Sequence, residues 1–477
     1  MQTLEIALII LLLPCLLASW LTPDRVEPRR ARLMSQVSHG LLILVLAAHL
    51  AFEGGHWQMI PAYGASMLTL VLVMIRRSRF GWKALVTAAV VLLAVASCGM
   101  AALLPMFELP APTGSFAIGT QIISLIDMSR KEDADPSGAH ARELVIQIWY
   151  PALPSNAERA PYRRRSETTL GSSYQSVDWT HARTDAPVAA ADGGFPVLIY
   201  NPGWNGRRTQ DTFLTEELAS HGYVVVAIDH PYNSGPVALA DGRVIRPVPT
   251  PELVDDVTSM EGVYAIINKE VEKETDDTLF VLKEIRAMNA DAQSPFAGHL
   301  DLSRVAALGY SLGGAVAAEA AYRDGTIKAV LDLDTPLYGE AAKGGIAQPF
   351  LLLSEELHTS TPEQLSKMTF GQRRDRQMDE QDYAHQLPLL RKPGNYHFSI
   401  WGTPHTGFQD TILFSRMRSV SGAGDIAPRS LMTIVRAYSV AFFDQTLRGV
   451  PSPLLAQKSS PFSEVTVQFN SVNSEPR

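Results

Sequence analysis

The stretch LGYSLGGA, residues 308–315, places Ser311 between Gly309 and Gly313 in a Gly-x-Ser-x-Gly pattern. The pattern alone is weak, because roughly one chain of this length in seven contains it by chance. Its surroundings are more specific: an apolar run, Arg304 to Leu308, precedes it, and a run rich in helix formers, Gly314 to Tyr322, follows it. Strand, sharp turn and helix are the context that holds a nucleophilic serine on an exposed elbow. The sequence therefore predicts that Ser311 is a nucleophile and not only a residue of a tight turn.

Apolar or alternating runs recur through the second part of the chain, with helical patterns between several of them. The predicted strands are Leu144 to Tyr150, Pro196 to Tyr200, Tyr223 to Asp229, Val305 to Leu308, Ile327 to Leu333, Pro349 to Leu353 and Asn395 to Ile400. The predicted helices are Phe213 to His221, Asn268 to Asn289 and Gly314 to Tyr322. Strands that alternate with helices predict an α/β fold with a mostly parallel sheet flanked by helices.

The composition of the chain limits the kinds of partner that it can bind. Its 477 residues carry a net charge of −8, and the eight Arg or Lys and four Asp or Glu that precede residue 108 leave about −12 for the remainder. Such an acidic domain is a poor candidate for binding nucleic acid. The two cysteines, Cys15 and Cys98, lie in apolar stretches, so they predict neither a disulfide framework nor a cysteine zinc site.

Residues 1–107 contain four apolar stretches, which are Leu4 to Leu21, Leu33 to Phe52, Trp57 to Ile75 and Ala84 to Phe107. Most approach the roughly 20 residues that a helix needs to cross a bilayer. We predict a membrane region of about four helices, and two or three spans with an interfacial piece stay an alternative. After a linker rich in Pro and Gly, residues 108–477 are predicted to form the catalytic domain.

The charges of the connecting loops predict an orientation. Arg25, Arg29, Arg30 and Arg32 lie between the first two stretches, and Arg76, Arg77, Arg79 and Lys83 lie between the last two. The intervening loop, Glu53 to His56, has no Arg or Lys. Because basic loops stay in the cytoplasm, the multi-pass membrane region should place the catalytic domain on the periplasmic or extracellular side.

A serine nucleophile needs a base, and the base needs a carboxylate to fix its tautomer. In α/β-hydrolases both come later in the chain, the acid first and the histidine second. The histidines after Ser311 are His358, His385, His397 and His405. His405 follows a predicted strand in a loop rich in Gly and Pro, so we predict it as the base, whereas His397 lies within the strand and suits a packed role.

The acid stays open on the pattern alone. One predicted strand ends with Asp332 and Asp334, and the next ends with Glu355 and Glu356. Asp332 and Asp334 share a face, because strand side chains alternate, so their spacing does not separate them. Asp334 ranks about even with the pair Glu355 and Glu356.

An oxyanion hole should use two backbone N–H groups. One is predicted at Leu312, directly after the nucleophile. The second is predicted at Trp204, in the loop after the strand that begins at Phe195, since Pro202 has no N–H to donate.

The segment Thr361 to Pro393 interrupts the alternation of strands and helices with many charged residues. This segment is equally compatible with a helical lid over the site, spanning about residues 361–393, and with a solvated loop on the surface.

Several short motifs together resemble the platelet-activating factor acetylhydrolase family of plasma and type II enzymes, within the α/β-hydrolase superfamily. They are Ile146 to Pro151, the strand that begins at Phe195 with its Gly-containing loop, Leu218 to Tyr223, Asp301 to Val305 with the serine elbow, Leu333 with Asp334, and Gly402 to Asp410. Two departures are Pro202-Gly203, where the family commonly has His-Gly, and the apolar N-terminal region, which is not part of the family's usual plan.

The resemblance implies Ser311 as nucleophile, Asp334 as acid, His405 as base, and Leu312 and Trp204 as oxyanion donors. It implies no metal or organic cofactor. We therefore expect a membrane-tethered serine esterase that cleaves short or oxidised acyl esters of lipids. The alternatives are an esterase for soluble or polymeric esters, similar to dienelactone hydrolases or polyesterases, and a catalytically silent membrane scaffold.

Overall fold

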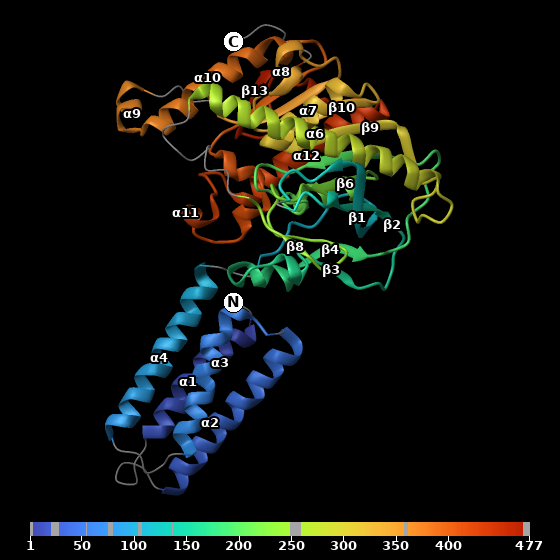
Figure 1. Ribbon diagram of the computed structural model, residues 1–477. Coiled ribbons are helices and arrows are strands. Elements are labelled where there is room, and N and C mark those ends of the chain that lie inside the picture. Colours follow the sequence, from blue (N-terminus) through green and yellow to red (C-terminus); the bar gives the residue numbers. More distant parts are fainter. Residues whose placement is uncertain are drawn as a thin grey trace. The chain divides into compact units, whose positions relative to one another are not determined.

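The computed structural model describes residues 3–20, 28–53, 55–74, 80–103, 107–135, 137–248, 259–356 and 361–470. The chain divides into two compact units, both drawn in Figure 1. The first is Met1–Phe107 with Leu413–Ser421, and the second is Glu108–Ile412 with Gly422–Arg477. The first unit is helical, and the second contains the β-sheets.

The first unit consists of α1 (Thr3–Trp20), α2 (Pro28–Ala48), the π-helix η1 (His49–Glu53), the short η2 (Trp57–Met59), α3 (Ile60–Met74), α4 (Phe80–Leu103) and α11 (Arg418–Ser421). Three of its helical stretches are long and apolar enough to cross a membrane, namely Thr3–Trp20, Arg29–Glu53 and Gly81–Leu103. The third predicted stretch instead forms η2 and α3, and the 15 residues of α3 extend only about 22 Å. A bilayer core is about 30 Å thick, so the described helices offer three candidate spans where we predicted about four.

The loop charges that set the predicted orientation are only partly described. Arg29, Arg30 and Arg32 lie in α2, and Lys83 lies in α4. Arg25, Arg76, Arg77 and Arg79 lie outside the described residues. The orientation therefore stays a prediction.

The second unit is built on an eleven-stranded sheet with the order β13-β12-β11-β10-β9-β5-β6-β2-β1-β4-β3. The strands are β1 (Ala117–Lys131), β2 (Ala141–Ala152), β3 (Arg159–Pro161), β4 (Trp179–Thr184), β5 (Phe195–Asn201), β6 (Val224–Asp229), β9 (Leu300–Tyr310), β10 (Ile327–Leu333), β11 (Phe350–Glu355), β12 (Tyr396–Ile400) and β13 (Val465–Phe469). From β6 through β12 neighbouring strands run parallel, and antiparallel pairs join β2 to β6 and β12 to β13. A separate two-stranded sheet pairs β7 (Val237–Ala238) with β8 (Val244–Ile245).

Helices cover the sheet. They are α5 (Thr212–Ser220), α6 (Met260–Ala290), α7 (Leu312–Arg323), α8 (Gly339–Gly344), α9 (Pro362–Lys367), α10 (Phe370–Leu390), α12 (Pro428–Arg448) and α13 (Pro453–Ala456). One apolar core joins Val281 of α6 and Ala317 of α7 to Ile199 and Val226 of the sheet. Each fully buried Val or Ile side chain of this core contributes roughly 1.5–3 kcal/mol. Tyr200, next to Ile199, points to the other face by alternation, toward α5 and α12.

This mixed sheet with flanking helices is consistent with the predicted α/β-hydrolase fold, and each of the seven predicted strands lies within or overlaps an observed one. The segment that we considered as a lid is helical: α9 and α10 occupy residues 362–367 and 370–390. Its movement as a lid stays a prediction.

Candidate active site

Ser311 lies at a sharp turn between β9 and α7, with φ 53° and ψ −131°. This backbone conformation is rare for a residue with a side chain, and it turns the hydroxyl out of the strand. Two glycines make the turn possible. A Cβ at Gly309 would lie 2.1 Å from the carbonyl of Gly313, and one at Gly313 would lie 2.0 Å from the backbone oxygen of Asn201. Alanine at either position would therefore displace the backbone that holds Ser311.

The structure brings the predicted nucleophile, base and acid together. Nε2 of His405 lies 2.9 Å from Oγ of Ser311, and Nδ1 of His405 lies 2.7 Å from Oδ2 of Asp334. A carboxylate only accepts hydrogen bonds, so Nδ1 carries the proton and Nε2 is left to accept from the serine hydroxyl. The three residues follow β9, β10 and β12, and parallel strands bring their carboxyl ends to one edge of the sheet.

The acid position is held by two backbone features. Asp334 has φ 66°, which turns the chain sharply where β10 ends. Its Oδ1 accepts a hydrogen bond of 2.7 Å from the backbone N–H of Glu355. Glu355, one of the alternative acids, thus supports Asp334 through its main chain.

Asp332, another alternative acid, is fully buried against α7, where a Cβ added to Gly314 would lie 2.1 Å from its Oδ1. Burial and the nearby charge of Asp334 raise the pKa of Asp332 well above its usual range. Its carboxyl group packs beneath the serine elbow, whereas that of Asp334 bonds the imidazole.

The surroundings of His405 are acidic. Burial opposes the imidazolium form, but the hydrogen bond to Asp334 and its negative charge outweigh that effect, so the pKa of His405 is raised. Burial also raises the pKa of Glu355, and it raises the pKa of Asp379 to about 6, although the charges of Arg376 and His405 oppose the latter shift. The site therefore stabilises the imidazolium that forms when His405 takes the serine proton.

The loop that carries His405 is fixed at both ends. The ring of Tyr310 stacks on the imidazole at 5.1 Å, and its hydroxyl donates to the backbone oxygen of His405. Farther along, Asp410 accepts from the backbone N–H of Thr212, in the first turn of α5, and from the hydroxyl of Tyr162. The sequence analysis assigned no role to Tyr310 or Asp410. The sequence pointed to them only because Tyr310 directly precedes the nucleophile in the serine elbow and Asp410 ends the Gly402–Asp410 motif.

Neither His397 nor His385 competes with His405 for the role of base. His397 is fully buried in β12, where it contacts Oγ of Ser354 at 2.8 Å and the hydroxyl of Tyr383 at 3.3 Å, and burial lowers its pKa to about 3. His385 lies in α10 and lines a separate cavity, and His358 lies outside the described residues.

Two backbone N–H groups beside Ser311 are available as donors. Leu312 is the first residue of α7, so its N–H has no acceptor within the helix. In the loop after β5, the N–H of Gly203 donates to Oε1 of Gln210, while that of Trp204 donates to no acceptor among the described residues. This loop passes close to the nucleophile, because a Cβ on Gly203 would lie 3.0 Å from the Cβ of Ser311.

Ser311 and His405 line two cavities. One, of about 380 Å³, is walled by Arg376, Asp379 and Tyr383 of α10. The other, of about 360 Å³, is lined by Arg163, Trp204 and Arg207 among others. A bound ester therefore has room for a group on each side of the nucleophile.

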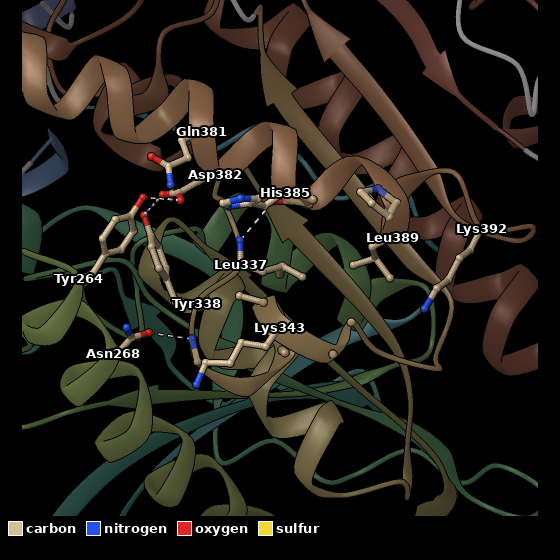
Figure 2. A pocket seen from close by; sticks show the side chains of 17 residues that line it. Tyr264, Asn268, Leu337, Tyr338, Lys343, Gln381, Asp382, His385, Leu389 and Lys392 are labelled. Atoms are coloured by element: carbon tan, nitrogen blue, oxygen red, sulfur yellow. Dashed lines mark hydrogen bonds between the residues drawn. The ribbon is translucent and has the colours of Figure 1, made fainter. Parts of the chain in front are cut away.

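A third cavity, of about 610 Å³, lies between α6, α8 and α10 (Figure 2). The hydroxyls of Tyr264 and Tyr338 point to the carboxylate of Asp382, at 2.6 and 3.4 Å. Tyr338 and Gln386 also line the 380 Å³ cavity beside Ser311, so these two residues form the boundary between the two spaces.

Comparisons with known proteins agree with this geometry. The chain is 25% identical over 404 residues to a probable 1-alkyl-2-acetylglycerophosphocholine esterase of Arthroderma benhamiae, covering 75% of this chain and 93% of the relative. It is 25% identical over 261 residues to the platelet-activating factor acetylhydrolase of Cavia porcellus, covering 47% of this chain and 58% of that protein. A solved ferulic acid esterase from Streptomyces cinnamoneus superposes with a TM-score of 0.61 at 28% identity, over 76% of this chain and all of the other.

The model of the platelet-activating factor acetylhydrolase isoform II family matches residues 162–449, which is more than half of the chain. This confirms the resemblance inferred from the motifs. One relative and the structural neighbour are esterases by name, the other relative is an acetylhydrolase by name, and the sheet, the serine elbow and the flanking cavities suit ester hydrolysis. The chain is a carboxylic ester hydrolase and belongs to the platelet-activating factor acetylhydrolase isoform II family.

Proposed function

We propose that the chain is a serine-dependent esterase that releases short or oxidised acyl groups from phospholipids, with Ser311, His405 and Asp334 as its catalytic triad. The observation that carries this proposal is the unbroken line of hydrogen bonds from the Ser311 hydroxyl through both nitrogens of His405 to Asp334. Labelling with a fluorophosphonate, which reacts with activated serines, tests it: the wild type should label, and Ser311→Ala and His405→Ala should not.

In the first half of the reaction, Oγ of Ser311 attacks the ester carbonyl while Nε2 of His405 takes the hydroxyl proton. The backbone N–H groups of Leu312 and Trp204 stabilise the oxyanion that forms. The same proton then passes from Nε2 to the leaving alcohol. In the second half, His405 activates a water that releases the acyl group, and the serine hydroxyl is restored. Asp334 holds the imidazole in the required tautomer throughout.

The cavity on the Trp204 side supports a phospholipid leaving group. Arg163 and Arg207 both line it, and among the described residues neither forms an ion pair with a carboxylate. Burial and the charge of Arg163 lower the pKa of Arg207 to about 10, which still leaves it charged. Nε of Arg207 is buried without a hydrogen-bond partner among the described residues. Two cations that line one cavity without a direct ion pair favour a phosphate, which guanidinium groups bind well.

We expect Arg207→Gln to lower kcat/KM for short-chain phosphatidylcholine esters by about 10-fold or more, since hydrogen bonds to charged groups contribute about 1.5–3 kcal/mol. Hydrolysis of p-nitrophenyl acetate, which has no phosphate, should be nearly unchanged. The matched control is Arg165→Gln, because Arg165 is exposed and does not line this cavity. An equal loss on both substrates would mean that Arg207 supports the fold and not a phosphate.

The raised pKa of His405 predicts the pH dependence. The base must be neutral to accept the serine proton, so kcat/KM should rise with pH through a pKa above the ordinary histidine value of about 6.5. Activity is lost as the pH falls through that pKa. A profile with p-nitrophenyl acetate measures it, and a midpoint below about 6.5 would contradict the dominance of Asp334 over burial.

A second candidate function is hydrolysis of soluble or polymer-linked phenolic esters, and the ferulic acid esterase superposition favours it. The 380 Å³ cavity, which Tyr383 and Tyr338 line, would accept an aromatic acyl group. A panel that compares methyl ferulate with acetyl and oxidised-acyl phosphatidylcholines separates the two functions through the ratio of kcat/KM values.

Membrane attachment through the first unit is part of the proposal. Besides the three long apolar helices, large apolar side chains there face outward, and Ile10, Leu44 and Leu92 are 63%, 65% and 70% exposed. Such surfaces are stable in lipid and costly in water. A membrane-impermeant charged fluorophosphonate should label the enzyme in intact cells or spheroplasts if residues 108–477 lie outside the cytoplasm. Labelling only after permeabilisation would reverse the orientation.

A further inference from the structure

The helical first unit contains a buried group of ionisable side chains that ester hydrolysis does not use. Glu5 of α1, His49 of η1 and His56 just before η2 are 5%, 0% and 4% exposed. Each offers a ligand atom, and these atoms all lie within 4.8 Å of one another. Ionisable groups among apolar helices are costly, and they mark functional sites in such surroundings.

The hydrogen bonds within this group resemble those around a metal site, in which further side chains orient the ligands. Nδ1 of His56 lies 2.6 Å from Oε1 of Glu5. Nδ1 of His49 lies 3.0 Å from Oε2 of Glu53, and its Nε2 lies 2.7 Å from the hydroxyl of Tyr63. A carboxylate on the second nitrogen of an imidazole is the usual outer contact of a metal-binding histidine, because it orients the ring.

The backbone conformation also supports a binding site at this point. His49 and Glu53 are the two ends of a π-helical turn that continues α2, and such turns occur frequently at functional sites. The hydroxyl of Tyr63, in α3, also accepts a hydrogen bond from the backbone N–H of His56. Three segments of the unit, α1, the end of α2 and the start of α3, thus converge on one point.

We infer that Glu5, His49 and His56 bind a divalent transition metal ion of the zinc type. Two imidazole nitrogens and a carboxylate oxygen are ligands that Zn²⁺ prefers, whereas Mg²⁺ and Ca²⁺ require mostly oxygen. Zn²⁺ bonds of about 2.0–2.1 Å place two tetrahedral ligand atoms about 3.3 Å apart, so small side-chain movements close the site. Binding replaces the hydrogen bond between Glu5 and His56: Nδ1 of His56 gives up its proton to bind the ion, and a proton on Nε2 keeps the imidazole neutral.

The charges balance on binding. The group contains two carboxylates, Glu5 and Glu53, and two histidines that are neutral when they act as ligands. The charge of one divalent cation is equal in size to that of these two carboxylates. The ion would link α1 to the turn between α2 and α3, so its role is to fix the helices of this unit. A metal site here differs from our prediction that the chain binds no metal. That prediction was based only on the two cysteines and on the chemistry of ester hydrolysis.

The test uses the full-length protein in detergent micelles after treatment with a chelator. Titration with Co²⁺, followed by its visible absorption, should saturate at one equivalent per chain, and Zn²⁺ should displace the Co²⁺. His56→Ala and Glu5→Gln should each weaken binding by at least about 10-fold, since even outer-shell changes cost 10–100-fold. His39→Ala is the matched control, because His39 is also buried in α2 but bonds the backbone oxygen of Ser35; it should bind as the wild type does.

A second readout guards against misfolded variants. Zn²⁺ should raise the melting temperature of the wild type and of His39→Ala but not of His56→Ala or Glu5→Gln. Hydrolysis of p-nitrophenyl acetate should persist in all of them and so report a folded second unit. A folded wild type that binds neither ion, or variants that bind as tightly as the wild type, would overturn the inference. Neither result would alter the proposed esterase function.

Discussion

Ser311→Ala should reduce kcat for p-nitrophenyl acetate by about 10⁵-fold or more, the scale of loss when a triad serine is removed. The remaining groups do not replace the nucleophile, because Oγ of Ser311 is the atom that His405 contacts in the elbow. Alanine retains the Cβ, so the strained backbone and the packing of α7 should survive. The measurement is a steady-state rate with purified enzyme, together with fluorophosphonate labelling.

The outcome is informative only if the variant is folded. Its melting temperature should stay close to that of the wild type, since Ser311 buries no large side chain. A folded Ser311→Ala enzyme with wild-type activity would remove the triad proposal and direct attention to another nucleophile.

Asp334→Asn should lower kcat by about 10⁴-fold, as the equivalent change does in serine proteases. The amide retains the shape of the carboxylate and can still accept the backbone N–H of Glu355. However, it no longer carries the charge that favours Nδ1–H on His405, so the imidazole can adopt the wrong tautomer. The kinetic pKa of His405 should fall in the same variant, because burial then acts without its main opposing charge.

The matched control is Asp332→Asn, two residues earlier and within β10 itself. Asp332 is fully buried, and burial together with the charge of Asp334 raises its pKa, so replacing it with the uncharged asparagine should change the site little. This variant should retain most of the activity. A large loss in Asp332→Asn with little effect in Asp334→Asn would exchange the roles of the two residues.

The parallel part of the sheet could be predicted because its strands are buried on both faces. Ile327 to Leu333 was predicted with the bounds that β10 has, since the segment is mostly apolar, and six of its seven residues are buried. β1 was missed because Ala117–Lys131 mixes exposed and polar residues at the antiparallel side of the sheet. α10 has no apolar stripe, and its buried positions include Arg374, Asp382 and Gln386, so only tertiary packing identifies it.

In the site, too, residues with a distinctive local sequence could be predicted, whereas features that depend on tertiary structure could not. Ser311 and His405 have local signals, a Gly-flanked elbow and a loop after a strand, and their side chains lie 2.9 Å apart. Choosing Asp334 over Asp332 required the family resemblance, because strand alternation gives both the same face. What distinguishes them is the φ of 66° at Asp334, and no periodic pattern encodes a single turn of that kind. That Arg163 and Arg207 line the same cavity could likewise not be predicted, because it depends on how two distant loops fold together.

The sequence separation within the triad has a consequence for how activity appears during folding. His405 is 94 residues from Ser311 and 71 from Asp334, and the three residues follow strands that must first pair in parallel. Contacts between distant segments form slowly, because a large loop entropy is lost before they stabilise the chain. Recovery of fluorophosphonate labelling after dilution from denaturant should therefore lag behind the recovery of helical signal. Enzymatic activity in this chain thus reports completion of the whole central sheet, and partly folded forms with native helices will be inactive.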